Sequence, residues 1–291
     1  TLQHPAAWRS LLDGVEAVVN AAGALQDGGR DDLAAVHHAG IAAMVSACEV
    51  AAVSRIVQIS AVGASADAST EFMRSKARGD AAVRAGVTDW VILRPGLVIS
   101  PNAYGGSALI RMLAAVPLVS PIAMPDARVQ TVAIDDLCGV VCDAVSGRLP
   151  ACTEADVVEA GSHSLQEVVA TFRGWLGFAP ARLSIALPRW SLAPVAVFAD
   201  ALATLGWRSP LRSTALRALQ DGIVGDATVL RAWYGRDLPS LQQTLDAMPA
   251  TLQERWFARL SLLLPLMVAT LSAFWLLSGV IALANVERAA A

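Results

Sequence analysis

The fold is decided by residues 53–95, which read VSRIVQIS (53–60), AVGASADAST (61–70), EFMRSKARGDAAVRA (71–85) and GVTDWVILRP (86–95). Two apolar, β-branched runs, Arg55–Ser60 and Trp90–Leu93, flank a segment with helical spacing, Thr70–Ala85. Neither run alternates polar with apolar residues, which predicts strands that are covered on both faces. The order strand, helix, strand predicts one unit of a parallel sheet wrapped by helices.

The same alternation continues on both sides of this unit. Upstream, Val15–Asn20 predicts a buried strand and Asp32–Val53 predicts a helix. Downstream, the expected strands and helices are Arg128–Ile134, Asp135–Val145, Asp156–Ala160 and Ser164–Leu176. We therefore expect an α/β domain with a doubly wound parallel sheet over residues 1–180. Residues 181–253 are expected to form a helical region on the substrate side, with helices over Leu187–Leu205 and Pro239–Met248.

The C-terminal segment predicts a membrane span. Residues 260–286 read LSLLLPLMVATLSAFWLLSGVIALANV without one charged side chain, and about 20 such residues suffice to cross a bilayer. The whole chain is 55% hydrophobic with a mean hydropathy of +0.51, which is high for a soluble protein. We assign residues 254–291 to a transmembrane unit. Arg255 and Arg259 precede the span, which places the preceding domain on the cytoplasmic side of the cytoplasmic membrane.

Composition excludes other classes of function. A net charge of −3 offers no basic surface, so we expect no nucleic-acid partner. The four cysteines form no C-x-x-C pair, and Cys138 and Cys142 lie one helical turn apart, so buried free thiols are predicted. The four histidines show no spacing that is typical of metal ligands, and we predict no metal site.

Small or polar residues follow each of the first three predicted strands. The run Asn20–Gly23 comes after the first strand, Ser60 ends the second, and Arg94–Gly96 ends the third, while Lys76 lies on the intervening helix. Carboxyl ends of parallel strands meet at one edge of a sheet, where such folds bind ligands, so these residues are expected to share a crevice. Each also has an ordinary explanation: a strand-to-loop turn, a strand-end serine, a chain reversal and a solvated lysine.

The combined order of these motifs resembles the short-chain dehydrogenase/reductase superfamily. The similarity covers roughly Leu12–Leu176 and is greatest to the atypical, extended branch of NAD(P)-binding proteins related to the complex I accessory subunit. It implies a Rossmann-like fold, lacking its first strands in this sequence, and NAD or NADP as cofactor. A second resemblance is carried by Glu254-Arg255-Trp256, Pro265 and the run Phe274–Gly279, which are similar to the first helix of DoxX-like membrane domains.

The first resemblance implies roles for individual residues. Lys76 would hydrogen-bond the nicotinamide ribose, and Ser60 would orient the substrate; these two are the candidate catalytic residues. The turn after the first strand would approach the adenosine side of the cofactor, and the Arg-Pro-Gly segment would lie near the nicotinamide. The complete set of candidate cofactor-binding residues is Asn20, Ala21, Ala22, Gly23, Ser60, Lys76, Arg94, Pro95 and Gly96.

Two departures from the family pattern affect the expected function. Phe72 stands at the position of the Tyr that transfers the proton in this superfamily, and a phenyl ring carries no ionisable proton. No G-x-x-G-x-x-G turn follows a strand in this sequence, and Gly28-Gly29 follows the wrong strand and lacks a third glycine. We therefore expect this sequence to bind the dinucleotide weakly.

Three functions fit these features. The preferred one is a membrane-tethered NAD(P)-binding protein of the atypical reductase kind, with a small carbonyl or quinone-like substrate. The second is a non-catalytic dinucleotide-binding sensor or assembly factor for a membrane complex, which Phe72 favours. The third is an active oxidoreductase that takes its proton from Tyr104 or from water.

Overall fold

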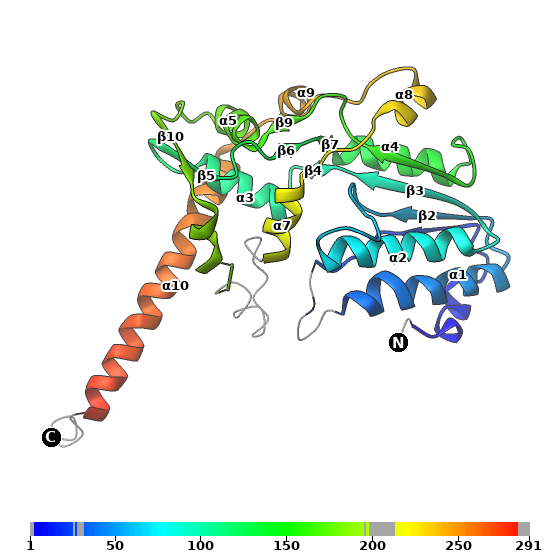
Figure 1. Cartoon of the computed structure of the whole chain (residues 1–291), viewed down its shortest axis with the longest axis horizontal. Coiled ribbons are helices and arrows are strands. Elements are labelled where there is room, and N and C mark those ends of the chain that lie inside the picture. Colours follow the sequence, from blue (N-terminus) through cyan, green and yellow to red (C-terminus); the bar gives the residue numbers. More distant parts are fainter. Residues whose placement is uncertain (1–2, 26, 28–31, 195, 198–212, 285–291) are drawn as a thin grey trace.

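The computed structural model describes residues 3–25, 27, 32–194, 196–197 and 213–284 (Figure 1). Its centre is a four-stranded parallel sheet with the strand order β1-β2-β3-β8. The strands are β1 (Ala17–Asn20), β2 (Arg55–Ile59), β3 (Asp89–Pro95) and β8 (Thr153–Val157). Val18 pairs with Ile56, and Val57 pairs with Val91. The parallel sheet predicted from the sequence is confirmed.

Helices cover both faces of this sheet. A π-helical turn, η3 (Ala35–Ala39), runs directly into α1 (Gly40–Val50), which packs beside α2 (Glu71–Ala85). These helices bury Ile56 and Ile92 on one face of the sheet. Helix α4 (Ile134–Val145) covers the other face, where Val57, Val91 and Leu93 meet its apolar stripe. Alternate strand residues therefore enter two separate cores, which explains why the strands read as continuous apolar runs.

A second, smaller layer of structure lies beyond the carboxyl ends of β3 and β8 (Figure 1). It contains three two-stranded sheets: β4 (Leu97–Ile99) with β7 (Thr131–Ala133), β5 (Val119–Ala123) with β10 (Leu183–Leu187), and β6 (Arg128–Val129) with β9 (His163–Ser164). Its helices are α3 (Gly105–Ala114), α5 (Leu165–Trp175), α7 (Ser213–Asp221) and α9 (Leu241–Ala247). Helix α8 (Thr228–Tyr234) instead packs against β8 and the core of the main sheet. Of the short 3-10 turns, η1 (Pro5–Ala7) packs against α1 and is followed by η2 (Arg9–Leu11), while η4 (Arg189–Ser191) follows β10. Phe172 and Leu176 are central to the core of this layer.

Two sequence expectations, one about the second layer and one about α4, are wrong. The chain was expected to be helical from about residue 180, but Leu183–Leu187 forms β10, whose backbone pairs in parallel with β5. The expected helix Leu187–Leu205 lies partly outside the described residues. Cys138 and Cys142 were expected to be buried, but both are exposed, because the apolar stripe that faces the sheet is formed by their neighbours on α4. Cys152 is also exposed, and Cys48 is buried.

Helix α10 (Leu252–Ala284) projects away from the body of the molecule (Figure 1). Its beginning packs against α3, where Ala258 is fully buried and the Arg259 guanidinium lies 4.8 Å from the centre of the Phe178 ring. Within the described part of the chain, α10 is the one helix that is long and apolar enough to cross a membrane. Its most apolar 18-residue window has a mean hydropathy of 2.1, and none of that window is buried.

Candidate functional site

The turn after β1 is built around Asn20. Its side-chain Nδ2 donates to Oε1 of Gln58 at 2.8 Å, and its Oδ1 accepts from the backbone N–H of Ala22 at 3.1 Å. The second contact closes an Asx-type turn, which is how a short polar side chain commonly ends a strand. Asn20 therefore ties the start of the turn to the neighbouring strand β2 and directs the chain towards Gly23.

Gly23 and Lys76 lie side by side at this edge of the sheet. A Cβ atom on Gly23 would lie 3.6 Å from Nζ of Lys76. The ammonium group donates to the carbonyl of Ile59, the last residue of β2, at 3.1 Å. Lys76 is buried, and burial lowers its pKa while the Asp80 carboxylate opposes that shift. The structure thus brings together the predicted residues Gly23 and Lys76, beside the carboxyl end of β2.

His37 completes this cluster, and the sequence analysis missed it. Its Nε2 accepts a hydrogen bond from the backbone N–H of Ala24 at 3.0 Å, and its Nδ1 lies 2.8 Å from Oγ of Ser75. Burial, and then the charge of Lys76, lower the pKa of His37 from 6.5 to about 4. His37 lies in the π-helical turn η3, and its role depends on a contact with the turn after β1 that no residue spacing in the sequence reveals.

Phe72 lies in the first turn of α2, close to the same histidine. Thr70 caps this helix by accepting a hydrogen bond from the N–H of Met73. The ring centroids of Phe72 and His37 are 5.6 Å apart and the ring planes meet at 68°, which is an edge-to-face contact. The position at which the family resemblance places a proton-donating phenol is therefore filled by an apolar ring that packs against a neutral imidazole.

Ser60 and Arg94 belong to a different cluster on the flank of α2. The Ser60 hydroxyl donates to Oδ2 of Asp80 at 2.7 Å, and Nε of Arg94 lies 3.6 Å from the same oxygen. Arg94 also forms ion pairs with Glu154 and, at 3.9 Å, with Asp156. Burial raises the pKa of Asp80, while the hydrogen bond from Ser60 and the charge of Arg94 lower it. The hydroxyl of Ser60 and the guanidinium of Arg94 thus face carboxylates of the protein.

Gly96 has a structural reason for its identity. A Cβ on Gly96 would lie 2.5 Å from the Gln130 carbonyl oxygen and 2.9 Å from a methyl group of Val158, so only glycine fits between these neighbours. The Pro95 carbonyl accepts from the N–H of Val62 at 3.3 Å. Their roles at a nicotinamide stay predictions. Tyr104, considered as an alternative proton donor, begins α3 with 79% of its surface exposed.

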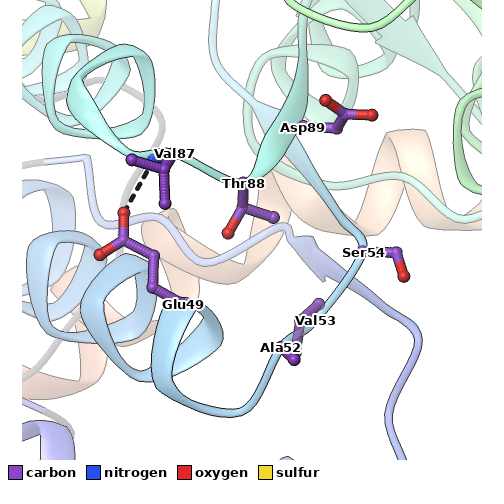
Figure 2. Close-up of a pocket in the computed structure, with 7 residues that line it drawn as sticks. All are labelled: Glu49, Ala52, Val53, Ser54, Val87, Thr88 and Asp89. Carbon is purple, nitrogen blue, oxygen red and sulfur yellow. Dashed lines mark hydrogen bonds between the residues drawn. The ribbon is translucent and has the colours of Figure 1, made fainter.

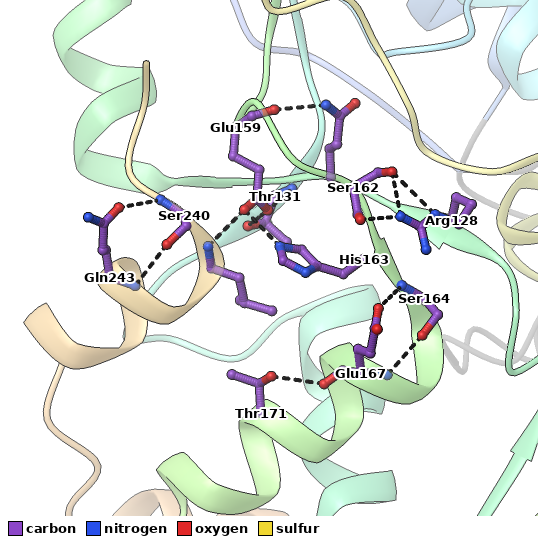
Figure 3. A network of polar contacts seen from close by, with 12 residues as sticks. Arg128, Thr131, Glu159, Ser162, His163, Ser164, Glu167, Thr171, Ser240 and Gln243 are labelled. Atoms are coloured by element: carbon purple, nitrogen blue, oxygen red, sulfur yellow. Dashed lines mark hydrogen bonds and ion pairs between the residues drawn. The ribbon is translucent and has the colours of Figure 1, made fainter. Parts of the chain in front are cut away.

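A buried carboxylate that the sequence analysis missed organises the second layer (Figure 3). Glu159 is 1% exposed and accepts four hydrogen bonds. Its Oε1 accepts from the backbone N–H and the hydroxyl of Thr131, at 2.9 and 2.6 Å. Its Oε2 accepts from Nε2 of His163 and from the backbone N–H of Leu241, both at 2.9 Å. One side chain thereby joins β7, β9 and the start of α9.

A cavity of about 330 Å³ lies at the opposite edge of the sheet (Figure 2). It lies where α1 ends and β2 and β3 begin, and Glu49 accepts a hydrogen bond there from the N–H of Val87. Parallel sheets bind their ligands at the carboxyl ends of the strands, so this cavity is not the cofactor crevice. Its lining residues are Glu49, Ala52, Val53, Ser54, Val87, Thr88 and Asp89.

Comparisons with known proteins agree with this geometry. Residues 1–112 match a family described as NAD(P)H-binding. No curated protein sequence matches the chain. Among solved structures, the Bordetella bronchiseptica enzyme WbmG, in complex with NAD and UDP, superposes with a TM-score of 0.62 at 16% identity, over 85% of this chain and 76% of its own.

Two reductases have the same fold. The Citrobacter sp. triphenylmethane reductase, complexed with NADP(H), gives a TM-score of 0.63 at 14% identity, over 86% of this chain and 82% of its own. The Escherichia coli NADPH-dependent quinone oxidoreductase QOR2, complexed with NADPH, gives 0.61 at 16% identity, over 85% and 81% of the two chains. At such identities the likeness concerns the fold. With the match of residues 1–112, it shows that this chain carries a Rossmann-like domain of the NAD(P)-binding kind.

Proposed function

We propose that the chain binds NAD or NADP at the carboxyl ends of β1 and β2, and that α10 tethers it to the cytoplasmic membrane with the body on the cytoplasmic side. The observation that carries the proposal is the buried ammonium group of Lys76 beside Gly23. Among the described residues, the Ile59 carbonyl is the hydrogen-bond acceptor of this lysine, which leaves further N–H donors for a ligand. The glycine leaves open the space that a side chain would fill.

Lys76 fits the nicotinamide end of the cofactor, where it would donate to the ribose hydroxyls. The turn from Asn20 to Gly23, which the resemblance assigns to the adenosine side, lies beside this lysine and would let the backbone approach the ligand closely. The chain offers fewer groups to bind the pyrophosphate of the cofactor, because no glycine-rich turn follows a strand in this sequence. When bound, the reduced cofactor supplies a hydride. The protein's own groups then bind and orient it, and Phe72 and His37 add an apolar, uncharged wall.

Phe72 favours a quinone-like substrate over a small carbonyl. Hydride addition to a simple carbonyl forms a strongly basic alkoxide, which requires a proton donor in the site. Hydride addition to a quinone forms a hydroquinone anion, which is a weak base and can take its proton from water. The oxidised cofactor and the hydroquinone then leave. A helix suited to the bilayer also places the domain near apolar acceptors of this kind.

The second candidate is a non-catalytic dinucleotide-binding sensor or assembly factor of a membrane complex. The apolar ring of Phe72, where the resemblance places the phenol, favours this function too. The similarity to complex I accessory proteins and to the first helix of DoxX-like domains belongs to the same proposal. Binding without turnover would distinguish this candidate from the preferred one.

The experiment uses the full chain in lipid nanodiscs. NADH and NADPH are titrated while the fluorescence of the dihydronicotinamide is followed, and cofactor oxidation is then measured with a short-chain quinone and with an aldehyde. We expect binding of at least one cofactor, and turnover with the quinone. The control is Lys76→Met, which keeps the length of the side chain but removes its donors, and is expected to weaken binding about tenfold or more. Equal binding by this variant, or no binding by the wild type, would contradict the proposal.

A further inference from the structure

His37 connects the turn after β1 to the helix that carries Phe72 and Lys76. The backbone N–H of Ala24 can only donate, so the Nε2 atom that it contacts must carry no proton. The proton of a neutral imidazole then lies on Nδ1 and is donated to Oγ of Ser75. The Ser75 hydroxyl in turn donates to the carbonyl of Phe72 at 2.8 Å. The chain of hydrogen bonds therefore has one direction, from the turn to α2.

Helix α2 packs closely against the backbone of His37. A Cβ on Gly79 would lie 2.3 Å from the His37 carbonyl oxygen and 2.7 Å from a side-chain carbon of Ile41. The absence of a side chain at Gly79 thus lets α2 touch the backbone of η3. His37 is itself fully buried, so its ring cannot be displaced without disturbing both helices. Within the described residues, the bond from Ala24 is the hydrogen bond that joins its ring to the turn.

The charges around His37 keep it in the neutral form that this bond requires. Lys76 and Arg78 on α2 disfavour protonation, and Asp27 favours it. Burial opposes a charge on the ring as well, and its effect is the largest. The imidazole therefore remains a hydrogen-bond acceptor throughout the neutral range.

We propose that His37 is a positioning residue that fixes the Gly23–Ala24 turn against α2 and thereby sets the affinity for NAD(P). The inference rests on the proposed dinucleotide site, but it assigns the control of that site to a residue outside the set predicted from the sequence. Without the bond to His37, the N–H of Ala24 loses its acceptor and Gly23 is free to move relative to Lys76.

Two substitutions separate this role from a merely structural one. In His37→Gln the amide oxygen reaches the position of Nε2 and can accept from Ala24, but the contact with Ser75 is lost. In His37→Asn the shorter amide reaches the position of Nδ1 and can donate to Ser75, but it cannot reach Ala24. Each variant keeps one of the two hydrogen bonds, so both are expected to lower the melting temperature by similar amounts. Only the first keeps the bond to the turn.

The test measures NADH and NADPH affinity of the full chain in nanodiscs, together with hydrogen exchange of the turn in the absence of cofactor. We expect His37→Gln to bind within about threefold of the wild type with a protected turn. We expect His37→Asn to bind about tenfold more weakly with a turn that exchanges faster, since the loss of one hydrogen bond corresponds to roughly that factor. Equal affinities for the two variants would overturn the role of His37 while leaving the dinucleotide site intact. Absence of binding by the wild type would overturn both proposals.

Discussion

The residues around Asp80 show how a side chain that was predicted to bind the cofactor can instead stabilise the fold. Arg94 ends β3 next to the proposed crevice, yet its guanidinium faces Asp80, Glu154 and Asp156. Replacing it by Met would remove the ion pair between Arg94 and the buried carboxylate of Asp80, and we expect the free energy of unfolding to fall by about 3 kcal/mol. Denaturant titration of the detergent-solubilised chain measures the loss. The control, Arg78→Met, breaks only an exposed pair with Glu71 and should cost about 0.5 kcal/mol.

A substitution at Gly23 can separate an effect on cofactor affinity from an effect on the stability of the fold. A methyl group at this position would make ordinary van der Waals contacts, 3.6 Å from Lys76 Nζ and 3.7 Å from His37 Nε2, and its backbone has no left-handed strain. Gly23→Ala should therefore leave the melting temperature almost unchanged. The methyl group would occupy the space proposed for the cofactor, so NAD(P)H affinity should fall about tenfold or more. A variant that bound as well as the wild type would place the cofactor elsewhere.

His37 also makes stability depend on pH. Its pKa is about 4 in the folded protein and near 6.5 in the unfolded chain, mainly because burial disfavours the charged ring. Between these values the unfolded state binds more protons, so the stabilisation is complete above pH 6.5 and is lost as the pH falls towards 4. The shift corresponds to about 3 kcal/mol. Unfolding measured across this range should show a steeper loss for the wild type than for His37→Gln, and parallel curves would contradict the assignment.

Among the helices and strands, the sequence predicted those that are indicated by local residue patterns. Strands β1, β2 and β3 and helix α2 were predicted from apolar runs and helical spacing, which depend on neighbours in sequence. Strand β10 was missed because what stabilises it is the backbone of β5, some 60 residues away. The candidate site shows the same difference between residues recognised from local patterns and residues defined by long-range contacts. Gly23 and Lys76 were identified by motif, whereas His37 depends on a long-range contact that no spacing reveals.

The carboxylate of Glu159 joins β7, β9 and α9, and a substitution there can test this role. Four donors from β7, β9 and α9 converge on its carboxylate, and an amide would turn one acceptor into a donor that faces another donor (Figure 3). Glu159→Gln should therefore destabilise the chain by about 2 kcal/mol and loosen α9. The same substitution at Glu167, which belongs to the capping box of α5 with Ser164, should be nearly neutral because Gln also serves there. Similar losses at the two positions would show that Glu159 does not join these elements.

At the scale of the whole molecule, we propose that α10 holds the nucleotide domain at a membrane. The helix leaves the body as a single uninterrupted element, so a membrane that takes up its apolar part brings the domain close to the bilayer surface (Figure 1). Cys138, Cys142 and Cys152 are exposed on the body and can report which side of the membrane it occupies. We expect a membrane-impermeant maleimide to label the chain in inverted vesicles but not in intact cells.

Cys48 serves as the internal control for this experiment. It is buried, and burial raises its pKa to about 11, so its thiol should react only after denaturation. The chain should also stay with the membrane after alkaline carbonate extraction, because that treatment releases proteins held only at the surface. Labelling of intact cells would reverse the proposed orientation. Release by carbonate would show instead that α10 packs against protein, since its apolar 18-residue window, none of which is buried within the chain, would otherwise remain exposed to water.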